Sequence, residues 1–111
     1  MINGDGLQTR DYVFVEDVAA ANVLALETSK TGAFNIGTSI ETDVNLIFEL
    51  VNKNFGTDWK QVHGPSRPGE QTISSLSYKK AKQILNWQPK IKLEDGIKKT
   101  VEWFKLHPER V

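Results

Sequence analysis

Residues 16–28 constrain the fold of this chain most, because they predict a helix that is apolar on nearly all sides. Glu16 and Asp17 stand where the positive end of a helix dipole favours negative charge. The apolar residues that follow go most of the way round the helix: Val18, Ala19, Ala20, Ala21, Val23, Leu24, Ala25 and Leu26. Such a helix needs packing on several sides, and a chain of 111 residues, one small domain at most, offers little material for it.

The amino terminus suggests incompleteness in a second way. Residues 3–6, Asn-Gly-Asp-Gly, are a strong turn signal because glycine tolerates positive φ. The β-branched and aromatic residues 11–15 predict a short strand after this turn. Only residues 1–2 precede the turn, so a hairpin here would lack its first strand. We therefore expect residues 1–111 to be one domain of a longer protein.

The middle of the chain predicts one further strand and one amphipathic helix. Residues 33–37 (Ala-Phe-Asn-Ile-Gly) are typical of a short buried strand. Apolar residues recur at three- and four-residue intervals over residues 43–55, which predicts a helix with one apolar face. Thr42 is the expected N-cap of this helix, and Gly56 is the expected stop.

The carboxyl-terminal half predicts two more helices. Residues 59–63 alternate weakly and are a candidate strand, and the Pro- and Gly-rich residues 64–69 predict a loop. We expect a helix from Ser77, as its cap, to about Trp87, and a last helix over residues 93–106. The fold class predicted is therefore α/β, with four helices and several short strands.

The composition excludes several classes of function. Lys plus Arg equals Asp plus Glu at 14 each, so no general attraction to nucleic acid or an anionic membrane is expected. The chain has no cysteine and therefore no disulfide or thiolate site. Its two histidines, His63 and His107, lack metal-ligand spacing. No apolar run reaches the roughly 20 residues of a membrane span, so a cytoplasmic protein is the default expectation.

Two arginines are candidate anion ligands. Arg10 directly precedes the predicted strand over residues 11–15, and Arg67 lies in the Pro/Gly loop with Glu70 three residues later. A guanidinium held by rigid backbone suits bidentate phosphate recognition better than a lysine does. The alternative for each is a surface ion pair, which contributes about 0–1 kcal/mol.

One pattern imitates a catalytic dyad. Tyr78 and Lys82 match Tyr-x-x-x-Lys, and this spacing places both side chains on one helix face. A lysine there lowers the pKa of a phenol, which permits acid/base chemistry. A two-residue pattern is weak evidence, and we interpret Tyr78 as an anchor of the apolar face of its helix.

The segments, in their order, resemble one family. Residues 4–18 are similar to the Gly-Asp-Gly-x-Gln-x-Arg-Asp-Phe/Tyr-Val-x-Val-x-Asp signature of extended short-chain dehydrogenase/reductases, the NAD-dependent epimerase/dehydratases. UDP-glucose 4-epimerase is the best-known member. Residues 34–38 resemble the family's Tyr/Phe-Asn-Ile-Gly segment, and residues 67–70 resemble its Arg-x-Gly-Asp/Glu loop. Its closing helices are matched by residues 80–82, 85–89 and 93–97.

The resemblance implies that the chain is the carboxyl-terminal, substrate-binding part of an NAD-dependent nucleotide-sugar epimerase/dehydratase. In the family, an amino-terminal Rossmann half binds NAD and carries the catalytic Ser/Thr and Tyr-x-x-x-Lys. That half is missing here, so this part alone is expected to be inactive and to bind no NAD. The intact protein is expected to act on a UDP- or dTDP-sugar.

The resemblance also implies roles for five residues. Arg10 would contact the diphosphate, and Tyr12 would line the adjacent wall. Val44 would pack against the base or ribose, Arg67 would hold phosphate from the other side, and Glu70 would accept a ribose hydroxyl. No catalytic or metal-binding residue is expected in this chain.

Two other interpretations of the chain stay open. One is a stand-alone, non-catalytic module that binds sugar nucleotides. The other is a module that associates with itself, as a homodimer, through uncovered apolar surface. The sequence leaves open the sugar, the base, and the choice between epimerase and dehydratase.

Overall fold

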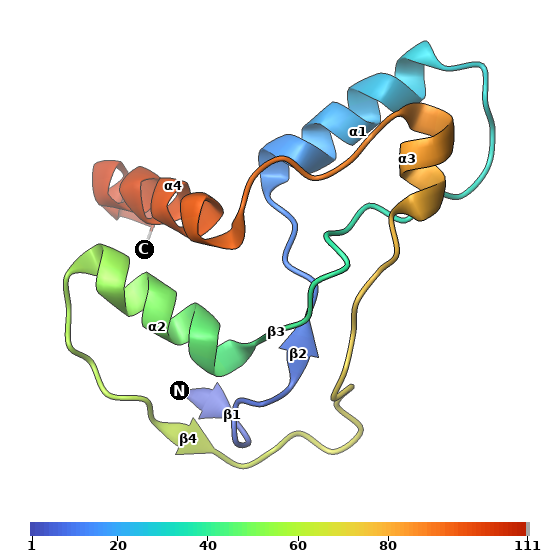
Figure 1. Cartoon of the computed structure of the whole chain (residues 1–111). Coiled ribbons are helices and arrows are strands. Elements are labelled where there is room, and N and C mark those ends of the chain that lie inside the picture. Colours follow the sequence, from blue (N-terminus) through green and yellow to red (C-terminus); the bar gives the residue numbers. More distant parts are fainter. Residues whose placement is uncertain (111) are drawn as a thin grey trace.

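The computed structural model describes residues 1–110. In chain order its elements are β1 (Ile2–Asn3), β2 (Thr9–Arg10), α1 (Val15–Glu27), β3 (Thr42–Asp43), α2 (Val44–Phe55), β4 (His63–Gly64), α3 (Lys79–Leu85), α4 (Leu93–Leu106) and a 3₁₀ turn η1 (Pro108–Arg110). α2 and α4 lie side by side, and α1 packs beside α3 at the other end of the molecule (Figure 1). Over the described residues, the structure therefore has an α/β fold with four helices and short strands.

The strands form two separate pairs. β1 runs parallel to β4, with Ile2 opposite His63 and Asn3 opposite Gly64. β2 runs antiparallel to β3, which directly precedes α2. These pairs bring the amino-terminal turn beside the loop that follows residue 64.

The main apolar core lies between α1 and α3. It consists of Ala21, Ala81, Leu85 and Trp87, with half-buried neighbours Val13, Leu24, Phe34, Ile36 and Tyr78 packed against it. The Trp87 indole donates to the backbone oxygen of Asp17 at 2.9 Å, so the largest core side chain has its polar atom satisfied.

The Asp17 carboxylate anchors the connection between α3 and α4. It is only 4% exposed, and it accepts the amides of Lys90 at 3.1 Å and of Ile91 at 3.0 Å. A buried carboxylate needs such donors, because an unpaired buried charge is costly. Asp17 therefore fixes where the chain passes from Trp87 toward α4.

The Asp11 carboxylate anchors a second set of loops, again by accepting backbone amides. Its carboxylate accepts the Thr38 amide at 2.7 Å, the Thr38 hydroxyl at 2.6 Å, and the amides of Ser39 and Leu76 at 3.0 Å each. Burial alone would raise the pKa of Asp11, but these hydrogen bonds outweigh burial and hold the pKa below its ordinary value of 3.8. The ionised form of Asp11 is therefore the form that joins the loops.

The molecule is open for its size. The radius of gyration is 16.4 Å, against about 13 Å for a compact domain of this length. The accessible surface is 8110 Å², against about 6200 Å² for a compact monomer of this mass. α1 carries part of the excess apolar surface, since Val15, Val23 and Leu26 are exposed. A helix that is apolar on several sides is here covered on one side only.

The helix predictions agree with the structure to within a residue or two at three of the four positions. Residues 16–28 correspond to α1, residues 43–55 to α2, and residues 93–106 to α4. Gly56, with φ of +76°, ends α2 as predicted. The fourth helix is shorter than predicted, because α3 spans Lys79–Leu85 and the left-handed Asn86 ends it before Trp87.

Both predicted N-caps were wrong. α2 is capped by Asp43, whose carboxylate accepts the Leu46 amide at 2.8 Å, while Thr42 lies buried in β3. The residue that precedes α3 is Tyr78, without a side-chain cap, so Ser77 does not begin that helix.

The strand predictions were wrong in position. Residues 11–14 and 33–37 are irregular in the structure, and in place of a strand over residues 59–63 only His63–Gly64 is paired. Asp11 supplies the acceptor for the loop amides that a ladder would otherwise satisfy. The predicted absence of a strand before the turn was also wrong, because Ile2–Asn3 forms β1.

We predict that Asp17→Ala lowers the free energy of unfolding by about 2 kcal/mol, because it leaves two backbone amides without their acceptor. Urea unfolding followed by tryptophan fluorescence measures this loss. Asp58→Ala is the control, since its side chain is 98% exposed; a change within about 0.5 kcal/mol is expected. Equal losses in the two variants would contradict the role of Asp17.

We predict that Asp11→Asn destabilises the chain at neutral pH and not at low pH. Because the pKa of Asp11 is lower in the folded chain, its stabilisation is fully present above about pH 4 and is lost as pH falls through the folded value. Urea midpoints of wild type and variant at pH 7, 5, 3 and 2 measure the difference. A difference that stays the same from pH 7 to pH 2 would contradict this role.

Candidate functional site

A cleft of about 510 Å³ lies between the amino-terminal turn and the loop after β4. Its walls are Asn3, Gly4, Asp5, Leu7, Gln8, Ser66, Arg67, Gly69, Glu70 and Thr72. The parallel pairing of β1 with β4 explains the position of the cleft, because the carboxyl ends of parallel strands meet at one edge and both loops leave from there.

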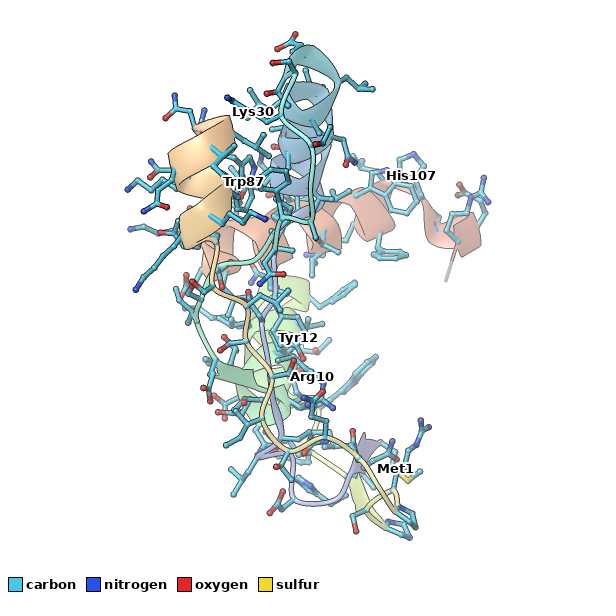
Figure 2. All side chains as sticks on the ribbon, turned by 90° about the vertical axis from the view of Figure 1, so that its right-hand side faces the viewer. Met1, Arg10, Tyr12, Lys30, Trp87 and His107 are labelled. Carbon is cyan, nitrogen blue, oxygen red and sulfur yellow. The ribbon has the colours of Figure 1, made fainter. Side chains whose placement is uncertain are left out.

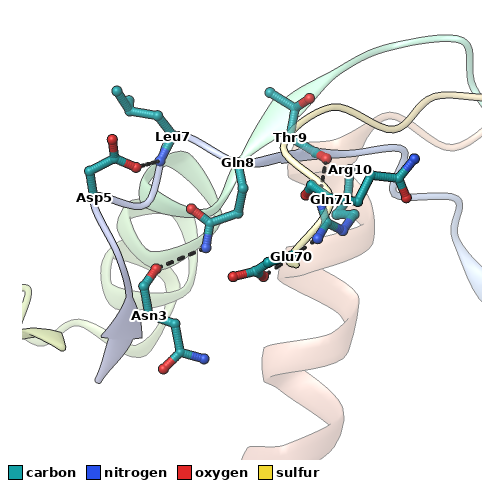
Figure 3. A network of polar contacts seen from close by, with 8 residues as sticks. All are labelled: Asn3, Asp5, Leu7, Gln8, Thr9, Arg10, Glu70 and Gln71. Carbon is teal, nitrogen blue, oxygen red and sulfur yellow. Dashed lines mark hydrogen bonds and ion pairs between the residues drawn. The ribbon is translucent and has the colours of Figure 1, made fainter. Parts of the chain in front are cut away.

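The turn over residues 3–8 is held by its own side chains. The Asp5 carboxylate accepts the Leu7 amide at 3.0 Å, and the Gln8 side-chain amide donates to the Asn3 carbonyl at 3.0 Å (Figure 3). Gly4 and Gly6 have φ of +69° and +76°, a region that favours glycine. The turn is therefore a preformed wall of the cleft.

Arg10 joins β2 to the opposite loop. One terminal nitrogen of its guanidinium donates to the carbonyls of Thr9 and Gln71, at 2.7 Å each, and the other lies 3.5 Å from Glu70 Oε1 (Figure 3). A guanidinium has five N–H donors in a fixed plane. Three are used in these contacts, so two are left for a ligand.

Arg67 differs from Arg10 in having no internal partner. Within residues 1–110 its guanidinium makes no hydrogen bond or ion pair, and its backbone carbonyl accepts the Glu70 amide at 3.2 Å. Gly69, with φ of +77°, closes the turn between them. This turn places Arg67 and Glu70 on the same wall of the cleft.

Tyr12 lines a second groove, of about 590 Å³, whose lining also includes Glu41, Leu46 and Lys90. Arg10 and Tyr12 lie midway between the Met1 end and the Trp87 end of the molecule (Figure 2). Burial chiefly raises the pKa of Tyr12; the nearby Asp43 raises it further and Arg10 opposes the shift. The phenol is neutral at pH 7 and can donate a hydrogen bond.

Val44 begins α2 beneath the turn. Its amide donates to the Gly6 carbonyl at 3.0 Å, and its side chain is half-buried. Of the five residues predicted as binding residues, Arg67 and Glu70 line the cleft and Arg10 reaches it through Glu70. Tyr12 lines the neighbouring groove, and Val44 lies next to the turn.

Five polar residues of the cleft were not predicted as site residues: Asn3, Asp5, Gln8, Ser66 and Thr72. Asn3 and Gln8 line it together with Arg67. Asn3 was interpreted only as a turn residue, and Gln8 only as part of a motif. The one available signal was that both flank the two glycines of the same turn.

Tyr78 packs as predicted, as an apolar anchor. Its ring lies edge-on to Trp87, with centroids 6.0 Å apart, and packs against the core between α1 and α3.

His63 has a structural contact, because its Nδ1 donates to the Gly4 carbonyl at 2.8 Å. In the part of the chain that the structure describes, no three His, Asp or Glu side chains are grouped to hold a metal ion.

The described residues contain no dinucleotide-binding turn of the Rossmann type. Parallel pairing in residues 1–110 is limited to β1 with β4, and neither strand leads through a Gly-x-Gly-x-x-Gly turn into a helix. That turn is what places the pyrophosphate of a dinucleotide at a helix N-terminus.

Among the described residues 1–110, no helix is long and apolar enough to cross a bilayer.

Known proteins similar to this chain belong to one family of sugar-nucleotide epimerases and dehydratases. A family model described as GDP-mannose 4,6 dehydratase matches residues 1–100. A putative UDP-glucose 4-epimerase of Methanocaldococcus jannaschii is 44% identical over 95% of this chain and 34% of its own length. A human dTDP-D-glucose 4,6-dehydratase is 33% identical over 94% of this chain and 32% of its own length.

Solved structures agree. The UDP-glucose 4-epimerase of Thermotoga maritima, solved with UDP-glucose, superposes with a TM-score of 0.91 at 45% identity, covering 96% of this chain and 35% of that one. The chain thus spans about a third of the length of the relatives that it matches. It belongs to the family of extended short-chain dehydrogenase/reductases that includes the UDP-glucose 4-epimerases and sugar-nucleotide dehydratases, and it matches their carboxyl-terminal part.

Proposed function

We propose that this chain is the nucleotide-diphosphate-binding part of an NAD-dependent nucleotide-sugar epimerase/dehydratase, most like UDP-glucose 4-epimerase. One observation carries the proposal: Arg67 and Glu70 share a cleft, and Arg10 is tied to Glu70 across 3.5 Å. A guanidinium in the cleft, that of Arg67, and a second one beside it, that of Arg10, suit the double negative charge of a diphosphate. In the proposal Tyr12 extends the wall and Val44 packs near the base or ribose.

The two arginines contribute differently. Arg10 is held by three contacts before any ligand arrives, so little of its conformational entropy remains to be lost on binding. Arg67, without an internal partner among residues 1–110, is exposed and adjusts to the ligand. Glu70 keeps one carboxylate oxygen outside the Arg10 contact, and this oxygen accepts a ribose hydroxyl.

The substrate class is supported by what related proteins bind. The Thermotoga maritima epimerase was solved with UDP-glucose, and a UDP-glucuronic acid 4-epimerase of Bacillus cereus, 30% identical, with UDP-glucuronic acid and NAD. NAD removes and returns a hydride in such enzymes, while the protein orients the sugar. Binding the remote nucleotide is the part of that task proposed for this chain.

We further propose that the catalytic groups and NAD are held by another part of the same, cytoplasmic protein, which packs on this chain. The exposed apolar residues of α1 and the open shape of the molecule support such a partner. A homodimer through the same surface is the alternative arrangement.

We predict that Arg67→Ala, in the protein that contains this chain with its NAD-binding part, raises the Kd for UDP-glucose by about tenfold or more. A charge-assisted hydrogen bond contributes about 1.5–3 kcal/mol, and 1.4 kcal/mol corresponds to tenfold. Isothermal titration calorimetry measures the Kd of wild type and variant.

The control for this titration is Arg110→Ala. Its side chain is 70% exposed, and its ion pair with Glu109 spans 3.9 Å, away from the cleft. Its Kd should equal that of wild type. An unchanged Kd for Arg67→Ala would reject the phosphate role of Arg67, and no binding of any UDP- or dTDP-sugar by folded wild type would reject the proposed function.

A further inference from the structure

The backbone carbonyls of the turn are all occupied. Each of four consecutive oxygens accepts a hydrogen bond from a donor elsewhere in the chain: Asn3 from the Gln8 side chain at 3.0 Å, Gly4 from His63 at 2.8 Å, Asp5 from the Asn45 side chain at 2.9 Å, and Gly6 from the Val44 amide at 3.0 Å. No carbonyl oxygen of residues 3–6 therefore lacks a donor.

This pattern matters because the turn is a wall of the cleft. A carbonyl oxygen carries partial negative charge and repels a phosphate oxygen placed next to it. A donor bonded to that oxygen offsets part of this charge and fixes the direction in which the oxygen points. The donors on residues 3–6 thus make the backbone of the turn less repulsive toward an anion in the cleft, whose lining also contains the Asp5 side chain.

Asn45 is the least expected of these donors. Its Nδ2 bonds the Asp5 carbonyl, but its Oδ1 is buried without a hydrogen-bond partner among the described residues. Leaving a buried acceptor unsatisfied costs about 1–3 kcal/mol. A side chain with this cost is poorly explained by stability alone.

The turn has no room for a side chain at position 6, because Asn45 lies next to it. A Cβ atom on Gly6 would lie 2.0 Å from Asn45 Oδ1, so any other residue at position 6 would displace the amide. The turn does not need this amide for its attachment, because Gly4 bonds the Gly64 carbonyl and the backbone amides of α2 bond Gly6. What the Asn45 side chain adds is the direction of one carbonyl, that of Asp5.

We propose that Asn45 is a positioning residue of the anion cleft, which holds the Asp5 carbonyl in place so that the turn presents no unbonded carbonyl oxygen to a bound diphosphate. This inference rests on the proposed function of the cleft. Asn45 acts through the turn and does not itself line the cleft.

The test is titration of the protein that contains this chain and its NAD-binding part with UDP and with uridine. Asn45→Ala should raise the Kd for UDP by about threefold to tenfold, the equivalent of one hydrogen bond. The Kd for uridine should stay within twofold, because uridine carries no phosphate. The melting temperature should stay within a few degrees, since the variant loses one exposed hydrogen bond and also one unsatisfied acceptor.

A second variant and a control complete the test. Asn45→Asp keeps the shape but places a carboxylate oxygen against the Asp5 carbonyl, so it should weaken UDP binding more than Asn45→Ala. Asn54→Ala is the matched control, because Asn54 lies on the same helix and donates to the Leu50 carbonyl at 2.7 Å, away from the turn. Its Kd for UDP should equal that of wild type.

The outcomes separate this inference from the proposed function. If Arg67→Ala weakens UDP binding and the Asn45 variants do not, the inference is overturned and the proposed function stands. Parallel losses for UDP, for uridine and in melting temperature would reduce Asn45 to a structural residue and also overturn it. If folded wild type binds neither UDP nor a UDP-sugar, both fail.

Discussion

The irregular segments of this chain depend on two carboxylates for their hydrogen-bond acceptors. Every described strand is two residues long, so ladder bonds satisfy few backbone amides outside the helices. Asp11 accepts amides from two loops that lie far apart in sequence, and Asp17 does so for the connection into α4. Asp11 lies four residues before α1 and Asp17 lies in its first turn, so the two anchors flank the start of this helix.

The sequence predicted the helices well because their signals are local. Three- and four-residue periodicity and Gly56 as a stop depend on neighbours within one or two turns, and α2 and α4 have the predicted bounds to within a residue. Strands need a partner, and the sequence does not say which segment it is. The apolar residues 33–37 lack a paired strand in the structure and instead pack Phe34 and Ile36 against the core. The cap of α2 was misplaced by one position because Thr42 and Asp43 are both good caps.

The sequence predicted candidate site residues but not the contacts that hold them. Arg10, Arg67 and Glu70 were chosen because they match family motifs, and nothing in their spacing says that Arg10 and Glu70 meet across 60 positions. The contact lies beside a single long-range backbone bond, from the Thr9 amide to the Thr72 carbonyl at 2.8 Å, and one such bond leaves no periodic signal. Asn45 was invisible for another reason. Its proposed role depends on the direction of the Asp5 carbonyl, and the presence of an asparagine at position 45 does not reveal that direction.

The two arginines of the proposed site differ in how their charge is balanced. Glu70 neutralises part of the Arg10 charge, so Arg10 with Glu70 presents oriented donors and little net charge. Arg67, which is exposed and makes no ion pair among residues 1–110, lines the cleft together with the Asp5 carboxylate. A lysine at position 10 lacks the planar fork that reaches the Thr9 and Gln71 carbonyls and Glu70 together. The contact between β2 and residues 70–71 thus depends on a guanidinium at position 10, whereas Arg67 is the basic residue in the lining of the cleft itself.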